Sequence, residues 1–287
     1  MASATKYLRS LLILGRVSNL PTVWSNCFAG WWLAGAGDWR NFALLCFGAT
    51  CLYLGGMYLN DAFDEQFDQQ HRPERPIPSG VISPAAVWRW GFAWLGLGLA
   101  SLAPFGKITL LCAMFLVIAI LIYDAVHKIF AFSPVLMAAC RFFLILLAAS
   151  TGSYGIIGYT IWVAVVLAAY IIGLSYIARK ESTFATLKYW PCLFLAAPLV
   201  LSWVVNQGEY QLRATVLALA VTLWMVRCLR YALWAPQRNI GRCVAGLLAG
   251  IPLIDLLAAW DGSMVNLITF VALFGLSLIF QRFIPAT

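Results

Sequence analysis

The sequence predicts an all-α polytopic membrane protein, and two observations lead to that prediction. Only 10% of the 287 residues are charged and 63% are hydrophobic, with a mean hydropathy of +0.86. Soluble domains carry roughly a quarter charged residues. Apolar runs of about twenty residues, the length that crosses a bilayer as a helix, recur along the whole chain. We therefore expect residues 1–287 to form one transmembrane domain.

Ten apolar runs follow one another, and nine or ten of them are expected to form transmembrane helices. They lie near residues 10–35, 42–60, 84–104, 107–126, 133–150, 156–178, 186–205, 212–232, 241–259 and 264–283. The ninth run, RCVAGLLAGIPLIDLLAAW, contains Pro252, which interrupts helices, and Asp255, which is costly in a membrane. We expect this run to be a broken or re-entrant helix, so the number of spans stays at nine or ten.

The basic residues predict the orientation of these spans. If the N-terminus lies inside, every Lys and Arg except Arg40, Lys107 and Arg213 falls on one side of the membrane. Cytoplasmic loops of membrane proteins collect Lys and Arg, so that side is expected to be cytoplasmic. Topology and attraction to anionic lipid headgroups then account for the net charge of +8. We expect no nucleic-acid partner.

The end of the second run carries acidic residues that this topology does not explain. The run GATCLYLGGMYL leads directly into NDAFDEQFDQQHRPERPIPSG, residues 60–80. If the helix continues, Asn60, Asp64 and Asp68 stand at i, i+4 and i+8 on one face, with Asp61 beside them. Neighbouring carboxylates repel each other unless a cation lies between them. Such oxygen ligands suit Mg²⁺, which completes its shell with water and phosphate oxygens.

Two arginines follow these carboxylates and extend the same interpretation. Arg72 and Arg75 are placed to hold a diphosphate by paired hydrogen bonds. The alternative is a solvated helix end whose charges pair with one another along the helix. The spacing alone leaves both interpretations open.

A second polar cluster ends the fourth run, at the same predicted side of the membrane. In IYDAVHKIFAFSPVLMAACR, Tyr123, His127 and Lys128 meet the membrane edge, and Arg141 lies inside the fifth run. An arginine within a span is costly and usually points into a bundle or a cavity.

A third cluster ends the sixth run. YIIGLSYIARKES contains Arg179, Lys180 and Glu181. Taken singly, Lys128, Arg179 and Lys180 are explained by the excess of positive charge on the cytoplasmic side. Three clusters at one face of the membrane indicate a shared polar site more strongly than any one of them does.

Residues 60–83 closely resemble the first aspartate-rich motif of the UbiA superfamily of intramembrane prenyltransferases. That motif reads N-D-x-x-D-x-x-x-D followed by R-P-x-x-S-G, and every fixed position is present. These positions are Asn60, Asp61, Asp64, Asp68, Arg75, Pro76, Ser79 and Gly80. YDAVHK resembles the family's Y-x-x-x-K-R at the end of its fourth helix, with His127 and Lys128 as the basic pair. GRVSNLPTVWSN resembles the family's first helix.

The resemblance implies a nine-helix bundle around a central cavity, open sideways to lipid and capped by polar residues on the cytoplasmic side. It implies an enzyme that uses Mg²⁺ and transfers an isoprenyl chain from its diphosphate to a small acceptor, aromatic or other. Asn60, Asp61, Asp64 and Asp68 are the implied catalytic site, and Asn60, Asp64, Asp68 and Glu181 the implied metal ligands. The implied diphosphate clamp comprises Arg72, Arg75, Tyr123, His127, Lys128, Arg141, Arg179 and Lys180. We expect the protein in a bacterial inner membrane, surrounded by lipid, with its site on the cytoplasmic side.

The chain departs from the family at the second motif, which normally has two or three aspartates at D-x-x-x-D spacing. Here that region reads YIARKESTFATLKYW, with Glu181 as its single acidic residue. We expect a second metal site that is weakened, or replaced by basic residues that hold the diphosphate directly, so one or two metals remain open. Together with HK…SPVLMAACR and LLAGIPLIDLLA, this region resembles an EboC-like subgroup of bacterial members, for which the residues do not identify the acceptor.

Two other functions remain open. Polar groups inside a bundle also mark transport paths, so a transporter of polyisoprenoids or anionic solutes is one alternative. That function predicts polar residues reaching both faces, whereas the opposite face has few charges beyond Arg40, Lys107 and Glu209. The altered second motif also leaves a catalytically inactive lipid-binding scaffold, which an assay of turnover would distinguish.

Overall fold

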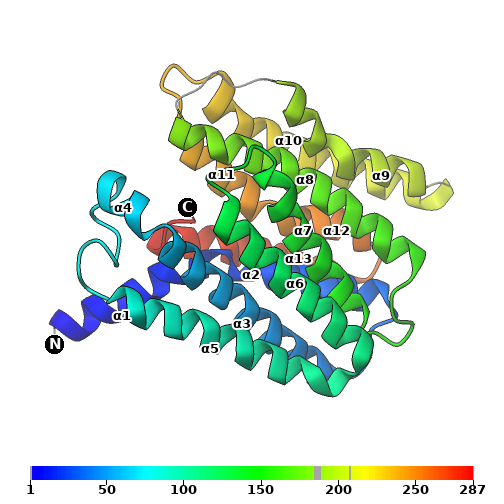
Figure 1. The fold of residues 1–287 in the computed structure, drawn as a ribbon. Coiled ribbons are helices and arrows are strands. Elements are labelled where there is room, and N and C mark those ends of the chain that lie inside the picture. The colour runs from blue at the N-terminus through cyan, green and yellow to red at the C-terminus, as the bar shows by residue number, and fades with distance from the viewer. Residues whose placement is uncertain (1, 184–188, 207, 287) are drawn as a thin grey trace.

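The computed structural model describes residues 2–183, 189–206 and 208–286, and these residues form helices and their connections, with no strand (Figure 1). The α-helices are α1 (Ala2–Leu14), α2 (Leu20–Leu33), α3 (Trp39–Phe63), α4 (Glu65–His71), α5 (Pro84–Leu102), α6 (Lys107–Val126), α7 (Ser133–Ala149), α8 (Gly158–Thr183), α9 (Ala197–Val205), α10 (Gln211–Leu233), α11 (Ile240–Ala249), α12 (Ile251–Ala259) and α13 (Met264–Phe283). Short 3₁₀ helices are η1 (Val17–Asn19), η2 (Ala103–Phe105), η3 (Trp190–Ala196) and η4 (Gly208–Tyr210). The all-α class is confirmed.

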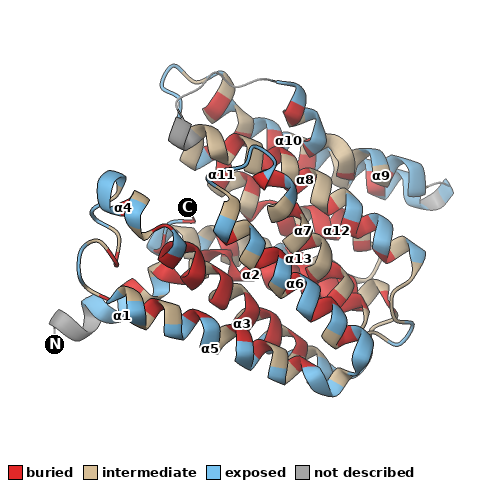
Figure 2. Ribbon diagram, in the orientation of Figure 1, coloured by how far each residue is buried: buried red, intermediate tan, exposed pale blue. Residues whose placement is uncertain are grey.

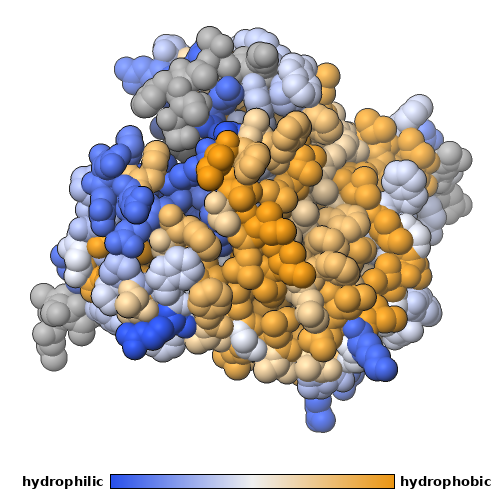
Figure 3. All heavy atoms as spheres, in the orientation of Figure 1, coloured by the Kyte–Doolittle hydropathy of each residue, from blue (hydrophilic) through white to orange (hydrophobic). Residues whose placement is uncertain are grey.

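Six stretches of the described chain are long and apolar enough to cross a membrane. They are α3, α6, residues 158–180 of α8, α10, α11 joined to α12, and α13. Two shorter apolar stretches are α7 and η3 with α9. Figure 3 shows a broad hydrophobic surface over the middle of one face, with hydrophilic residues gathered toward α4. The chain is an integral membrane protein, while its predicted total of nine or ten spans stays a prediction.

The first predicted span, near residues 10–35, is not one helix. α1 ends at Leu14, Arg16 adopts the left-handed conformation with φ 40°, and η1 leads into α2. A residue at positive φ cannot continue a right-handed helix. Pro21 lies at the start of α2, where its missing N–H costs nothing. This break separates α1 from α2. It also places the side chain of Arg16 against Asn60 and Asp61 at the end of α3.

α2 lies at the centre of the bundle. It packs against α3, α7, α12 and α13, and most of its residues are buried (Figure 2). Phe28 and Trp31 of α2 are almost completely buried and belong to the main hydrophobic core. The sequence of a helix that is buried on most sides is apolar all round, whereas a surface helix has apolar residues on one face only.

α3 and α5 pack against each other along much of their length, and glycines make their close approach possible. A Cβ at Gly55 would lie 2.9 Å from the backbone oxygen of Gly91, and a Cβ at Gly98 would lie 3.1 Å from that of Gly48. Small residues let membrane helices pack with their backbones in contact. α5 occupies the third predicted span, and its packing holds the C-terminal end of α3 in place.

The ninth predicted span is interrupted at Gly250, as Pro252 indicates. α11 ends at Ala249, and α12 begins at Ile251 with Pro252 in its first turn. The two helices together form a 20-residue apolar stretch. This interruption places Asp255 in the buried part of α12, next to α2.

Candidate functional site

The aspartate motif lies where α3 passes into α4. The backbone N–H of Asp64 donates to Asn60 O over 3.0 Å, and that of Asp68 donates to Asp64 O over 2.9 Å. The helical path therefore runs almost unbroken from Asn60 to Asp68, as the i, i+4, i+8 spacing predicted. The side chains of Asn60, Asp61, Asp64 and Asp68 are all buried. Carboxylates are rarely buried unless they are paired or bind a cation.

Two arginines from different parts of the chain meet Asp61. Arg16 Nη2 lies 3.2 Å from Asp61 Oδ1, and Arg75 Nη1 lies 3.1 Å from the same oxygen. Arg75 Nη1 also lies 2.8 Å from Asp68 Oδ2. The turn that begins at Arg72 brings Arg75 back over α4, with its N–H bonded to Arg72 O. Arg75 thereby joins two carboxylates of the motif.

Asp64 faces the basic pair at the end of α6. Lys128 Nζ lies 2.7 Å and His127 Nε2 3.4 Å from Asp64 Oδ1. Burial alone would raise the pKa of Asp64, but hydrogen bonds from His127 and Lys128 outweigh it and lower that pKa below its ordinary value. The ammonium of Lys128 also lies 3.6 Å from the centre of the Phe67 ring. The first and second predicted clusters are therefore in direct contact.

One oxygen of Asp68 has no partner. Its Oδ1 is buried and accepts no hydrogen bond, while Oδ2 binds Arg75. Burial raises the pKa of Asp68 more than Arg75 lowers it. An ionised carboxylate with an unpaired buried oxygen is a suitable ligand for a cation.

Below the motif, a small cavity of about 80 Å³ lies between α2, α3, α6 and α7. Its polar lining comes from Tyr53, Tyr123, Asp124 and Arg141, and the rest is apolar. Asn60 Nδ2 donates to Asp124 Oδ1 over 3.0 Å, whereas Asp124 Oδ2 is buried without a partner. The ring of Tyr123 stacks on His127, so the predicted Tyr123 side chain lies between the cavity and the basic pair.

Three further predicted residues, Arg72, Arg179 and Lys180, form no ion pair with the carboxylates of the motif. Arg72 caps the end of α4 and forms no ion pair within the described chain. Arg179 Nη1 donates to Phe130 O over 2.8 Å, on the connection between α6 and α7. Lys180 lies over the Tyr176 ring. The side chain of Glu181 lies outside the described part of the structure, so its role as a metal ligand stays a prediction.

Arg141 belongs to a separate polar network inside the bundle. Its Nη1 donates to Asn26 Oδ1 over 2.7 Å and its Nη2 to Thr22 Oγ1 over 2.9 Å. Asn26 Nδ2 in turn donates to Asp255 Oδ2 over 2.7 Å, and Ser25 donates to the same oxygen. Arg141 contacts α2 and lines the small cavity, and its place in a diphosphate clamp stays a prediction.

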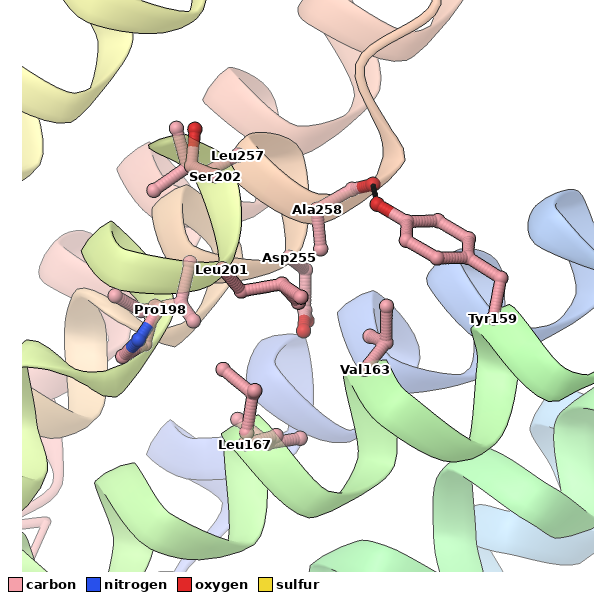
Figure 4. Close-up of a pocket in the computed structure, with 11 residues that line it drawn as sticks. Tyr159, Val163, Leu167, Pro198, Leu201, Ser202, Asp255, Leu257 and Ala258 are labelled. Carbon is pink, nitrogen blue, oxygen red and sulfur yellow. Dashed lines mark hydrogen bonds between the residues drawn. The ribbon is translucent and has the colours of Figure 1, made fainter. Parts of the chain in front are cut away.

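On the far side of Asp255 lies a second cavity, of about 10 Å³ (Figure 4). Asp255 points toward it from α12, and Tyr159 closes one end by donating from its hydroxyl to Ala258 O over 2.8 Å. This volume is about the minimum that holds one water molecule. The space is too small for a substrate.

Two residues of the site were not predicted as functional from the sequence. From the sequence, Arg16 was interpreted only as one of the basic residues that orient the chain in the membrane, although it lies in the GRVSNLPTVWSN segment. In the structure it contacts both Asn60 and Asp61. Asp124 lies within YDAVHK and contacts Asn60. The signal for Asp124 was present, because an acidic residue inside a span is by itself an indication of function.

Comparison with known proteins agrees with this geometry. A profile of the UbiA prenyltransferase family matches residues 19–182, which is more than half of the chain. The chain belongs to the UbiA prenyltransferase family. The matched region of this UbiA chain includes the aspartate motif, the basic pair just after α6 and Arg141. The EboC-like subgroup stays a prediction.

Curated relatives share shorter stretches with the UbiA chain. Digeranylgeranylglyceryl phosphate synthase of Methanopyrus kandleri is 34% identical over 96 residues, which cover 33% of this chain and 35% of that protein. The synthase of Halobacterium salinarum is 33% identical over 106 residues, covering 36% and 38%. That of Methanothrix thermoacetophila is 49% identical over 51 residues, covering 17% and 19%. The chain thus matches well under half the length of these relatives.

Solved structures share the fold over nearly the full length. A structure from work on digeranylgeranylglyceryl phosphate synthase in membranes superposes with a TM-score of 0.63 at 17% identity, covering 94% of this chain and 99% of that one. A UbiA homolog from Archaeoglobus fulgidus bound to GPP and Mg²⁺ gives a TM-score of 0.55 at 15% identity, covering 96% and 97%. At these identities the likeness establishes the fold of the UbiA chain.

Proposed function

We propose that this UbiA chain is a Mg²⁺-dependent prenyltransferase, which transfers an isoprenyl chain from its diphosphate to an acceptor at the cytoplasmic face. One observation carries the proposal. The buried carboxylates Asp61, Asp64 and Asp68 meet cations from three separate segments, at Arg16, Arg75 and Lys128. A solvated helix end with charge pairs along the helix would not need these distant partners. Structures of a family member with GPP or DMAPP and Mg²⁺ support the choice of donor and metal.

The residues present fit Mg²⁺. Within the described chain, no three Asp, Glu, His or Cys side chains are grouped closely enough to hold a metal by themselves. Mg²⁺ does not require such a group, because it usually takes one or two carboxylates and finds its other ligands on water and substrate phosphate. Asp64 and Asp68, with the unpaired Oδ1 of Asp68, would hold it, and Asn60 and Asp61 lie beside them. When bound, the metal would neutralise charge on the diphosphate.

The chain's own residues support the chemistry that this donor requires. In prenyl transfer the allylic C–O bond breaks, the diphosphate takes the electron pair, and the acceptor forms a bond to the carbon and loses a proton. Lys128, His127 and Arg75 stand at the carboxylates, where they can bind the departing diphosphate by charge-assisted hydrogen bonds. The largely apolar cavity below excludes water from the allylic cation.

The proposal also covers the side of the membrane on which the site lies and the part of the donor that the cavity holds. Lys6, Arg9, Arg89 and Arg238 are exposed basic residues of the predicted inner side, the side of the motif, which supports a cytoplasmic site. At about 80 Å³ the cavity is smaller than the roughly 300–1,000 Å³ of a ligand pocket, so it admits only the donor carbons next to the diphosphate.

Binding of a non-reactive donor tests the proposal without knowledge of the acceptor. We expect a thio analogue of geranylgeranyl diphosphate to bind the detergent-purified protein with Mg²⁺ and not with EDTA. Asp64→Asn should weaken this binding by about tenfold or more, as loss of a metal-site residue does. Glu65→Gln is the matched control, because Glu65 is the adjacent acid and, in the described chain, its carboxylate accepts a hydrogen bond from Gln69 and forms no ion pair. Binding that ignores Mg²⁺ and is unchanged in Asp64→Asn would contradict the proposal.

A further inference from the structure

α6 carries two buried polar side chains, one near each of its ends, Thr109 and Asp124. Thr109 Oγ1 accepts a hydrogen bond from the Ser150 hydroxyl over 2.9 Å. Asp124 is 4% exposed, and its Oδ1 accepts from Asn60 Nδ2 over 3.0 Å. An acidic side chain within a membrane span is costly and indicates a function. The steps of prenyl transfer set out above do not use Asp124, so its function has to be sought in its contact with Asn60.

Asp124 lies on the face of α6 that leads to the basic pair. Residues 124, 127 and 128 stand at i, i+3 and i+4, so their side chains project from the same side of the helix end. His127 and Lys128 meet Asp64, whereas Asp124 meets Asn60, one turn earlier on α3. The two contacts join the ends of α3 and α6. The contact of Asp124 lies one turn further inside the bundle.

The two ends of the Asn60 carboxamide bind opposite kinds of group. Nδ2 donates to Asp124, and Oδ1 accepts from Arg16 Nη2 over 3.0 Å. An ionised carboxylate only accepts hydrogen bonds, and a guanidinium only donates them. A reversed carboxamide would bring its oxygen against the carboxylate and its NH₂ group against the guanidinium, so both hydrogen bonds would be lost. Asp124 and Arg16 together therefore fix which way the Asn60 side chain points.

This orientation turns the oxygen of Asn60 toward the carboxylates of the motif. Arg16 Nη2 lies 3.0 Å from Asn60 Oδ1 and 3.2 Å from Asp61 Oδ1, so the two oxygens face one positive charge together. An amide oxygen is a suitable ligand for Mg²⁺, whereas an amide NH₂ group only donates hydrogen bonds. A group that orients a metal ligand typically contributes about 10–100-fold to metal affinity.

Packing alone does not explain a carboxylate at position 124. Apart from Thr109, the other buried residues of α6 are Cys112, Ala113, Leu116, Ala119 and Ile120. Asp124 Oδ2 is buried without a partner in the described chain, at the wall of the small cavity below the motif. An unpaired buried oxygen costs stability, which an apolar side chain would avoid. The hydrogen bond to Asn60 is the contact that offsets this cost.

We propose that Asp124 is a positioning residue of the metal site, which holds the Asn60 carboxamide with its oxygen turned toward the carboxylates of the motif. The inference rests on the proposed function, because Asn60 belongs to the metal-binding motif. Asp124 acts through Asn60 and touches neither donor nor metal in this role. The role requires an accepting oxygen at the place of Oδ1 and does not require a negative charge.

Titration of Mg²⁺ at a fixed concentration of the thio analogue of geranylgeranyl diphosphate tests the proposal on the detergent-purified, full-length protein. We expect Asp124→Leu to raise the Mg²⁺ concentration for half-maximal binding of the analogue by about tenfold or more, because Asn60 loses its orienting partner. Asp124→Asn should stay within about threefold of wild type, since an amide oxygen can take the place of Oδ1. Asp124→Ala replaces Asp124→Leu if the leucine variant does not fold.

Thr109→Val is the matched control, because it removes the other buried polar group of α6, near the opposite end of the helix. It should leave the Mg²⁺ dependence within about twofold of wild type, as expected for a distant site. Thermal unfolding in EDTA compares the stability of all variants without metal. If Asp124 only packs, Asp124→Leu will keep the Mg²⁺ dependence of the wild type whatever its stability, and that result would overturn the proposal. An equal rise in Asp124→Asn and Asp124→Leu would also overturn it, because charge and not the hydrogen bond would then matter.

Failure of this inference is distinguishable from failure of the proposed function. Wild type that binds the analogue only with Mg²⁺, together with an unchanged Mg²⁺ dependence in Asp124→Leu, refutes only the positioning role. Wild type that binds no analogue, or binds it equally well in EDTA, refutes the Mg²⁺-dependent prenyltransferase itself.

Discussion

Arg75 is the side chain on which the geometry of the motif most depends. Its Nη1 lies 3.1 Å from Asp61 and 2.8 Å from Asp68, and the side chain is 15% exposed. Without a cation between them, these buried carboxylates would repel each other. The planar guanidinium can serve two carboxylates at once, whereas a lysine ammonium acts as a single point of charge.

Replacing Arg75 by lysine should therefore lower stability although the charge is kept. We expect Arg75→Lys to reduce the free energy of unfolding by about 1–2 kcal/mol. The measurement is thermal unfolding of the purified protein in detergent without Mg²⁺. Arg72→Lys is the control, because Arg72 lies three residues away, forms no ion pair in the described chain and should shift stability by less than about 0.5 kcal/mol. Equal shifts in the two variants would show that the bridge contributes nothing.

At this scale the sequence predicted the carboxylates well and their partners poorly. The line of Asn60, Asp64 and Asp68 follows from helical spacing, which a sequence contains directly. The contact of Arg16 with Asp61 joins residues 45 apart and depends on the left-handed backbone at Arg16. The spacing of residues within one helix gives no information about such a long-range contact. The contacts of Arg141 could not be predicted for the same reason, since its partners lie on α2.

Among the elements, the α3–α5 pair depends on glycine. A Cβ at Gly98 would lie 2.6 Å from Leu52 Cδ2 and 3.1 Å from the backbone oxygen of Gly48, and Leu52 is completely buried. Gly96, two residues earlier on α5, has nothing within 4 Å of a Cβ. The two positions share a helix and differ only in what they face.

The pair predicts opposite effects of one substitution. Gly98→Ala should destabilise the protein by about 1–3 kcal/mol, because the backbones must separate. Gly96→Ala should be neutral or stabilising by roughly 0.5–1 kcal/mol, since alanine favours a helix over glycine. Thermal unfolding of both variants in one detergent compares them. Equal stability of Gly98→Ala and Gly96→Ala would show that the backbones of α3 and α5 need not approach closely at Gly98.

Most element positions were predictable, but a break inside the first run was not. Apolar runs located α3, α6, α8, α10 and α13 within a few residues. The break between α1 and α2 was missed, because the apolar residues on both sides of Arg16 were taken as one span, whereas the helix stops at Leu14. Tyr53 holds that break by donating its hydroxyl to Arg16 O over 3.2 Å, a contact from another helix.

For the molecule as a whole, the buried network of Arg141, Asn26 and Asp255 joins α7, α2 and α12. Each of the three residues is less than 10% exposed. Asn26 bridges the two charged groups by accepting from Arg141 and donating to Asp255. Removing one charge leaves the other without its counterpart inside the bundle, which is more costly than removing both.

A double-mutant cycle measures this coupling. Arg141→Met and Asp255→Leu should each destabilise the protein by roughly 3 kcal/mol or more, and the double variant by less than the sum. Thermal unfolding in detergent gives the values, provided that each variant elutes as a single species. Strictly additive losses would show that the two charges do not stabilise each other through Asn26.

The same network has a consequence for how the chain enters the membrane during synthesis. Asn26 and Asp255 are 229 residues apart, so α2 and α7 are inserted long before α12 leaves the ribosome. Arg141 finds Asn26 and Thr22 early, and the nascent bundle can hold it. Asp255 has no such partner until α12 reaches α2, and a carboxylate is poorly tolerated alone in lipid. The late helices must therefore assemble on a bundle that already exists, and the C-terminal third of the chain is expected to insert poorly when it is synthesised without α2.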